Sequence, residues 1–276
     1  MLRDITLGQY YNADSPIHKL DPRTKLIGTL IYIITVFMFR NPLVFIPVLL
    51  FLIVTIRLSK VPFKYIVRGL KPILILLLIT AFFNLFLTKG EPIFTVWKLS
   101  LTKEGIYNAF FLCARLIFLV TGSSLMTLTT TPTQLTDGLE SLLGFLKVIK
   151  VPVHEIAMMM SIALRFIPIL MEELDKIMKA QMARGAEFDS GNIVKKIKAV
   201  IPLLIPLFIS AFRRANDLAL AMEARCYRGG EGRSKMKPLK YKKQDTFSFV
   251  VLFIYLAVTI VFGKFVSIES IVSLMG

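Results

Sequence analysis

Residues 246–263 read TFSFVVLFIYLAVTIVFG, and none of them is charged. A helix is the only single segment that satisfies its own backbone hydrogen bonds in hydrocarbon, and about 20 mainly apolar residues, with about 17 as a lower limit, cross a bilayer. This stretch therefore predicts a membrane-spanning helix. Working outward from it, four comparable stretches bring the predicted number of spans to about five: 24–40, 41–57, 69–88 and 107–128.

The composition agrees with a membrane protein. Of 276 residues, 55% are hydrophobic and 19% are charged, and the mean hydropathy is +0.68, whereas soluble domains run to about 45–50% apolar and about 25% charged. The two cysteines, Cys113 and Cys226, match no disulfide, zinc or redox spacing. We expect no cleaved signal peptide, because residues 1–25 are mostly polar.

The basic residues predict an orientation. The net charge is +16, from 34 Lys and Arg against 18 Asp and Glu. A cytoplasmic N-terminus puts 28 of the 34 basic residues on the cytoplasmic side and five outside, three of these five in the loop at 89–103. The remaining one, Arg115, lies within a span. This asymmetry follows the positive-inside rule, so we expect a multi-pass protein with its N-terminus in the cytoplasm and, with five spans, its C-terminus outside.

The basic excess does not indicate nucleic-acid binding. The cluster before the last span lacks the interleaved aromatic residues of a base-stacking surface. It is better explained as a topogenic cluster, or as one that faces the lipid bilayer. Its members are Arg233, Lys235, Lys237, Lys240, Lys242 and Lys243.

Residues 129–245 predict three helices on the cytoplasmic side. They are too polar for ordinary spans and too apolar for an ordinary soluble domain. The predicted helices cover about 133–147, 152–186 and 192–228, and each of the two long ones changes from apolar to charged along its length. Prolines should bend both long helices. Ala211, Ala215 and Ala219 form a small-residue stripe that we expect to pack on the preceding long helix.

Both long helices end in the same way. The first ends with Ala183-Arg184-Gly185 and the second with Ala224-Arg225-Cys226. Arginine near a helix C-terminus is commonly explained by capping. Two matching ends favour a second role, because a guanidinium between small residues suits a groove that presents a carboxylate.

These features resemble the transmembrane T component of energy-coupling factor transporters, prokaryotic importers of vitamins and metals. The stretch Gly8-Gln9-Tyr10 followed by Ser15-Pro16-Ile17-His18-Lys19-Leu20-Asp21-Pro22-Arg23-Thr24-Lys25 resembles the opening signature of that family. Ala183-Arg184-Gly185 resembles the first of its two Ala-Arg-Gly-type motifs. Ala224-Arg225-Cys226 takes the place of the second, with cysteine where glycine is frequent.

The resemblance implies a scaffold of a vitamin or micronutrient importer. Arg184 and Arg225 would pair with acidic residues of two ATP-binding-cassette ATPase subunits (EcfA and EcfA′), and the apolar faces of the long helices would hold a substrate-binding S component. We expect this chain to be no enzyme and to bind no cofactor, with ATP and Mg in the partner ATPases and the complex in the prokaryotic cell (inner) membrane. Candidate contacts for the S component are Met158, Met159, Ile162, Leu203 and Leu207.

The expected fold is an all-α polytopic membrane protein with about five spans and three coupling helices, two of them long and crossing. Its parts are residues 1–128 with four spans, 129–245 with the coupling helices, and 246–276 with the last span. The sequence has no Gly-x-x-x-x-Gly-Lys-[Ser/Thr] motif, so the energy must come from a partner.

Two other classes of function stay open, a self-contained secondary transporter and a membrane enzyme. The first would need repeated or broken spans with a paired intramembrane acid, and the second a convergent catalytic set. Arg115 has no acidic residue within a span to pair with, so we expect a structural role, with its head snorkelling outward. His18 and His154 lack a second ligand nearby in the sequence, which argues against a metal site.

Overall fold

The computed structural model describes residues 10–39, 42–88, 92–96, 99–186, 193–230, 236 and 238–275. The chain divides into two compact units. We call Gly8–Gly138 with Leu239–Gly276 the span unit, and Met1–Leu7 with Leu139–Pro238 the crossed-helix unit. Gly8, Gln9, Arg233, Lys235 and Lys237, which the sequence analysis singled out, lie outside the described residues.

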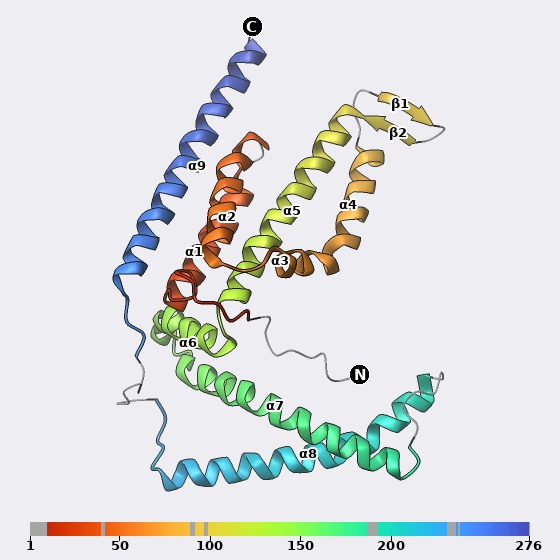
Figure 1. Ribbon diagram of the computed structural model, residues 1–276, viewed down its shortest axis with the longest axis vertical. Coiled ribbons are helices and arrows are strands. Elements are labelled where there is room, and N and C mark those ends of the chain that lie inside the picture. Colours follow the sequence, from red (N-terminus) through yellow and green to blue (C-terminus); the bar gives the residue numbers. More distant parts are fainter. Residues whose placement is uncertain are drawn as a thin grey trace. The chain divides into compact units, whose positions relative to one another are not determined.

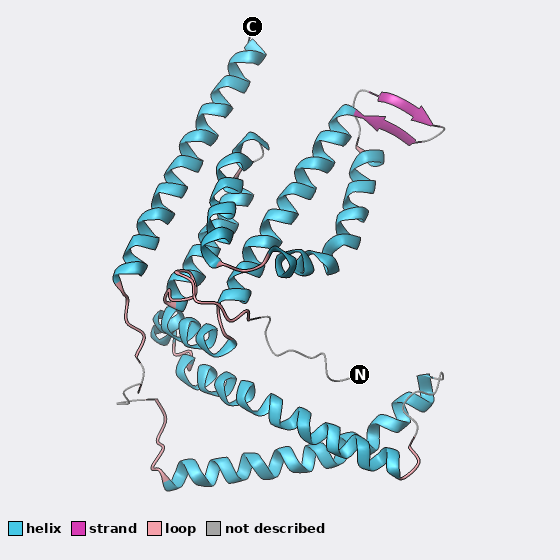
Figure 2. Ribbon diagram, in the orientation of Figure 1, coloured by secondary structure: helices cyan, strands magenta, loops and turns pink. Residues whose placement is uncertain are grey.

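The span unit is built from helices that pack around α5 (Figures 1 and 2). α5 contacts α1, α2, α3 and α4, and α9 contacts α1 and α2. Short 3₁₀ turns at Pro42–Val44 and Lys71–Ile73 precede α2 and α4. The helices are α1 (Pro22–Met38), α2 (Phe45–Ser59), α3 (Phe63–Leu70), α4 (Leu74–Leu87), α5 (Lys103–Thr129) and α9 (Lys243–Met275).

Aromatic side chains form the core of the span unit. The ring centroids of Phe45 and Phe111 lie 4.9 Å apart, and those of Phe51 and Tyr255 lie 4.2 Å apart. Tyr32 is buried, and its hydroxyl donates to the carbonyl of Phe118 at 3.0 Å. Such ring pairs bury large apolar areas, and the buried hydroxyl is satisfied, so they fix α1, α2, α5 and α9 against one another.

Within the described residues, four helices are long and apolar enough to cross a membrane: Phe63–Phe86, Lys103–Thr129, Val153–Ala183 and Lys243–Lys264. Lys103–Thr129 and Lys243–Lys264 contain the predicted spans at 107–128 and 246–263, and Phe63–Phe86 covers the predicted span at 69–88 except for its last two residues. The first two predicted spans form shorter helices, α1 with 17 residues and α2 with 15. The fourth helix, Val153–Ala183, is the first long helix of the predicted cytoplasmic insert.

The loop predicted outside the membrane at 89–103 contains a β-hairpin. β1 (Pro92–Val96) pairs antiparallel with β2 (Leu99–Thr102), and Val96 faces Leu99. The expected all-α architecture is confirmed, and this short hairpin is a local addition to it. Pro92–Val96 does not alternate between apolar and polar residues, and the four residues Leu99–Thr102 are at the lower limit for such a pattern, so the hairpin was not predicted.

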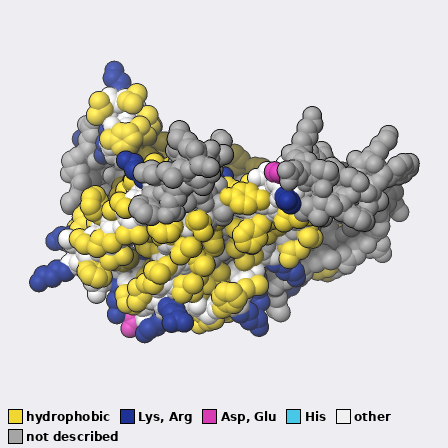
Figure 3. Space-filling model, turned by 90° about the horizontal axis from the view of Figure 1, so that it is seen from above, with side chains coloured by type: hydrophobic (Ala, Val, Ile, Leu, Met, Phe, Trp, Pro, Cys, Tyr) yellow, Lys and Arg dark blue, Asp and Glu magenta, His cyan; other side chains and the backbone are white. Residues whose placement is uncertain are grey.

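The surface of the span unit is largely apolar. Side chains such as Leu30, Leu50, Phe110 and Phe253 are 60–74% exposed. In Figure 3 the described side chains on the visible face are mostly hydrophobic, with Lys and Arg at its margin. A soluble domain rarely exposes so much contiguous apolar surface, whereas a lipid-facing surface requires it.

The three helices predicted for residues 129–245 are present, and the two long ones lie in the crossed-helix unit. α6 (Pro132–Leu142) begins in the span unit and continues as a 3₁₀ helix, Leu143–Ile149. α7 spans Val153–Ala183 and α8 spans Ile193–Ala224. Both helices continue through their internal prolines, Pro168 in α7 and Pro202 and Pro206 in α8. The two long helices were predicted to end at about residues 186 and 228, but α7 ends three residues earlier, at Ala183, and α8 four residues earlier, at Ala224.

Candidate functional site

The end of α7 is a Schellman cap. The amide of Ala186 donates to the carbonyl of Gln181 at 3.0 Å, and the amide of Gly185 donates to that of Met182 at 3.0 Å. Gly185 has φ +88°, in the left-handed region that this motif requires. Arg184 is the C-cap residue, so its side chain projects from the point where the helix stops.

The end of α8 has the same cap. The amide of Tyr227 donates to the carbonyl of Met222 at 3.0 Å, and the amide of Cys226 donates to that of Glu223 at 2.8 Å. Cys226 takes the place of Gly185, with φ +54°. Arg225 therefore stands at the position of Arg184. The cysteine that departs from the Ala-Arg-Gly pattern leaves the backbone geometry of the motif unchanged.

All six motif residues are exposed, namely Ala183, Arg184, Gly185, Ala224, Arg225 and Cys226. We call these two groups of three the helix tips. Within the described part of the chain, neither Arg184 nor Arg225 has an ion pair. A β-carbon placed on Gly185 would meet nothing within 4 Å. The tips are thus open to a partner, and each presents one guanidinium flanked by small side chains.

A polar contact joins α7 to α8. Glu173 accepts a hydrogen bond from the hydroxyl of Ser210 and forms an ion pair with Arg214 at 2.8 Å. Ala215 and Ala219 are exposed. The expectation that the small-residue stripe packs on α7 was therefore wrong for Ala215 and Ala219, whereas Ala211 is half-buried. Ser210 and Arg214 are the α8 residues that contact Glu173 of α7.

The crossed-helix unit also exposes apolar side chains. Of the residues proposed to contact the S component, Met159 is 58% exposed and Met158, Ile162 and Leu207 are half-buried, whereas Leu203 is only 7% exposed. Leu203 therefore offers little surface to a partner. The accessible apolar surface of α8 near Leu203 includes Leu204, Ile205, Phe208, Ile209 and Phe212.

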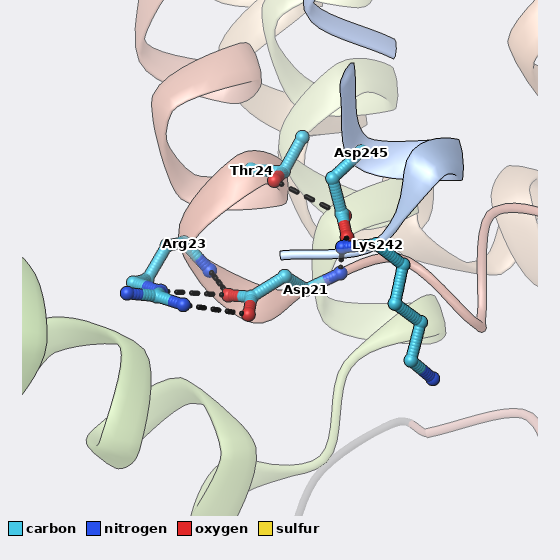
Figure 4. A network of polar contacts seen from close by, with 5 residues as sticks. All are labelled: Asp21, Arg23, Thr24, Lys242 and Asp245. Atoms are coloured by element: carbon cyan, nitrogen blue, oxygen red, sulfur yellow. Dashed lines mark hydrogen bonds and ion pairs between the residues drawn. The ribbon is translucent and has the colours of Figure 1, made fainter. Parts of the chain in front are cut away.

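The opening signature forms an anchor at the start of α1 (Figure 4). Asp245, which is 1% exposed, accepts hydrogen bonds from the amide of Asp21 at 2.7 Å, the hydroxyl of Thr24 at 3.2 Å and the amide of Lys242 at 2.7 Å. Arg23 in turn donates to both carboxylate oxygens of Asp21 at 3.0 Å. We call these five residues the anchor. It ties the first turn of α1 to the first turn of α9.

Asp21 stays ionised in the anchor. Burial opposes its ionisation, but hydrogen bonds from the side chain and amide of Arg23 hold the pKa of Asp21 below its ordinary value. The same carboxylate accepts from the Arg23 amide at 2.9 Å and so caps α1. α1 therefore begins at Pro22, with Asp21 as its N-cap and a proline in its first turn.

The rest of the signature fixes α1 to the end of α5. His18 donates from Nε2 to the carbonyl of Tyr11 at 2.9 Å and accepts at Nδ1 from the hydroxyl of Ser15 at 2.6 Å. This is the neutral tautomer, and burial lowers the pKa of His18 because it penalises the imidazolium. Lys25 donates to the carbonyls of His18 and Thr129. The signature residues therefore hold the start of α1 against the end of α5.

The residues set aside from the sequence have structural surroundings. Arg115 donates to the carbonyl of Phe39 at 2.7 Å and so caps the end of α1, which is the structural role expected for it. His154 contacts Glu140 at 2.9 Å. Among the residues that the structure describes, no group of three or more His, Cys, Asp and Glu could hold a metal ion.

Asp245 was not predicted as a residue of the anchor. It lies 224 residues from Asp21 along the chain, so no local pattern links the two. The only signal was a lone acidic residue after two lysines, immediately before an apolar span.

Comparison with known proteins supports one family. The profile of the family described as "Cobalt transport protein" matches residues 13–238. The chain is 53% identical over 263 residues to the protein named energy-coupling factor transporter transmembrane protein EcfT from Clostridium kluyveri, covering 94% of this chain and 97% of that protein. Proteins of the same name from Bacillus subtilis and Lactococcus lactis subsp. cremoris are 46% and 43% identical, each over 95% of this chain and 99% of theirs.

Proposed function

The chain belongs to the family of energy-coupling factor transporter transmembrane proteins, the T components, and on this premise we propose that its helix tips dock on two ATP-binding-cassette ATPase subunits. As a T component it is a non-catalytic membrane subunit of a transporter complex. The finer roles are our proposal. The scaffold transmits movement from the two ATPases to a substrate-binding S component of a vitamin or micronutrient importer.

The observation that carries the proposal is the equivalence of the two tips. Each places an exposed arginine at the C-cap of a long helix, next to a residue in the left-handed conformation. A guanidinium can take a carboxylate with two parallel hydrogen bonds, which fixes orientation as well as affinity. Two equal tips on one chain fit two similar partners, and ATPase subunits of this class act in pairs.

The crossing of α7 and α8 supports a mechanical role. The contact of Glu173 with Ser210 and Arg214 lies between the apolar and charged parts of the helices. Movement of one tip would therefore be passed to the other helix at this contact. We propose that nucleotide binding and hydrolysis in the ATPases shift α7 and α8, and that this shift topples the S component and opens its substrate to the cytoplasm.

The S component is proposed to lie on the exposed apolar surface of α7 and α8. This surface includes Met158, Met159 and Ile162, together with the five accessible α8 residues from Leu204 to Phe212. Methionine side chains are flexible and can repack against different partners. We propose that Leu207 contributes at the margin and that Leu203 supports its neighbours from beneath.

The charge distribution supports a cytoplasmic N-terminus in the prokaryotic cell membrane. Most basic residues then face the cytoplasm, where the ATPases and the nucleotide are found. We propose that ATP and Mg bind only to the partner chains, since this sequence has no P-loop. Membership of the family favours this function over a secondary transporter or a membrane enzyme.

Transport by the reconstituted complex tests the proposal. Replacing both tip arginines (Arg184→Ala with Arg225→Ala) should leave the protein in the membrane and lower uptake at least tenfold, because each change removes the guanidinium that is proposed to pair with an ATPase carboxylate. The matched control is Arg213→Ala with Arg228→Ala, which removes two exposed arginines of the same unit. Uptake at the wild-type rate without Arg184 and Arg225 would refute the proposed coupling.

A further inference from the structure

The span unit has a groove that combines three cations with an apolar wall. It encloses about 480 Å³ between α3, the start of α4 and α5. We call it the basic groove. It is lined by Lys64, Val67, Arg68, Leu70, Lys71, Leu74, Leu77 and Ile117.

The cations of the basic groove follow the period of a helix. Lys64, Arg68 and Lys71 are spaced four and three residues apart, so they lie on one face of α3 and its continuation. All three side chains are exposed. The sequence from 57 to 88 contains no Asp or Glu. Within the described residues, no ion pair involves any of the three.

The opposite wall of the groove is apolar. Leu74 is 53% exposed and Ile117 is 37% exposed, and Leu77 lies half-buried beside them. Leu74 and Leu77 belong to the helical run Phe63–Phe86, which is long and apolar enough to cross a membrane. The cations stand at the start of this run, the level at which lipid headgroups meet the hydrocarbon.

We propose that the basic groove binds one anionic phospholipid. Its phosphate contacts Lys64, Arg68 and Lys71, and one acyl chain follows Leu74, Leu77 and Ile117. Charge complementarity selects this occupant, because three cations without a carboxylate attract a phosphate, and a zwitterionic lipid carries a cation that they repel. The inference does not depend on the proposed coupling to ATPases. The bound lipid would contact both α3 and α5 and so stabilise their packing.

Lipid binding to the full-length chain tests this site. The purified protein in detergent is titrated with phosphatidylglycerol or phosphatidylcholine, and bound lipid is counted by native mass spectrometry. We expect one saturable phosphatidylglycerol, held at least tenfold more tightly than phosphatidylcholine. The triple variant Lys64→Gln, Arg68→Gln, Lys71→Gln should weaken it at least tenfold.

Two further variants separate a defined groove from diffuse charge. The matched control Arg57→Gln, Lys147→Gln, Lys240→Gln removes three exposed cations outside the groove and should keep the affinity within twofold. Ile117→Trp fills the apolar wall and should weaken binding with every cation in place. A monodisperse, helical variant is required in each case, as judged by gel filtration and circular dichroism.

Three results would overturn the site. An equal loss of phosphatidylglycerol affinity in the control triple variant would show diffuse electrostatic attraction. An unchanged affinity in the Lys64, Arg68 and Lys71 variant or in Ile117→Trp would show that the lipid does not bind in the basic groove. If the triple variant still binds phosphatidylglycerol but loses a co-purifying subunit, the occupant is a protein and the lipid assignment is wrong.

Discussion

At the scale of single residues, the geometry of the two helix tips makes capping compatible with the proposed docking. Arg184 ends α7 in a Schellman cap, and Arg225 ends α8 in the same hydrogen-bond pattern. The backbone amides satisfy the cap by themselves, so both guanidiniums stay exposed. Capping and docking are therefore compatible, because the backbone performs the first and the side chain is left for the second.

The residue that follows each tip arginine is glycine in one tip and cysteine in the other, so removing the glycine and introducing one should have opposite effects on helix capping. Gly185 and Cys226 both have positive φ. Side chains with a β-carbon pay about 1 kcal/mol for this conformation, whereas glycine adopts it freely. Gly185→Ala should weaken the cap of α7 by about 1 kcal/mol, and Cys226→Gly should strengthen that of α8 by a similar amount.

Hydrogen exchange at the amides of residues 185–186 and 226–227 measures both effects. Exchange should speed up about fivefold in Gly185→Ala and slow down in Cys226→Gly. Ala183→Gly, which leaves the left-handed residue unchanged, serves as the control for a small-residue exchange at the tip. Faster exchange in Cys226→Gly would contradict the assigned cap.

At the scale of elements, two polar contacts between distant segments hold the helices in place. Within the crossed-helix unit, Glu173 joins α7 to α8 through Ser210 and Arg214. Within the span unit, Asp245 joins the start of α9 to the start of α1. The two differ in burial, because the side chains of Glu173 and Arg214 are 24% and 39% exposed, whereas Asp245 is 1% exposed. Their expected energies differ accordingly.

The α7–α8 contact predicts a small coupling energy. A double-mutant cycle of Glu173→Gln and Arg214→Gln should give about 0.5–1 kcal/mol in the free energy of unfolding, since water screens a part-exposed pair. Glu172→Gln, an exposed neighbour, should have no effect. Denaturant unfolding of the full chain measures these values. A coupling energy of zero would show that the Glu173–Arg214 ion pair does not stabilise the packing of α7 on α8.

The anchor predicts a larger effect. Asp245→Asn should lower the free energy of unfolding by about 2 kcal/mol, because the new amide cannot accept from all of the buried donors of Asp21, Thr24 and Lys242. The control Asp14→Asn breaks an exposed ion pair with Lys19, in which the Asp14 side chain is 81% exposed. It should change the free energy of unfolding by less than about 0.5 kcal/mol. Equal thermal stability of both variants would contradict the anchor.

At the scale of the whole molecule, sequence patterns predicted what is local and missed what is distant. Three of the spans, the three helices of the insert and both tips follow from hydrophobic runs and short motifs. The hairpin at Pro92–Thr102 was missed because its strands are short, and α3 was missed because its eight residues mix apolar and basic side chains. The Asp21–Asp245 contact and the basic groove were missed because they join segments far apart in the sequence.

In the assembled transporter, the two helix tips are proposed to lie against ATPase subunits. A photo-reactive amino acid can replace Ala183 or Ala224, both exposed beside a tip arginine, in the complex purified through a tag on this chain. Leu50, 63% exposed on α2, is the control position. On irradiation, both tip positions should form adducts with ATPase subunits, and Leu50 should form none. An assembled complex in which neither tip position yields an ATPase adduct would contradict the account.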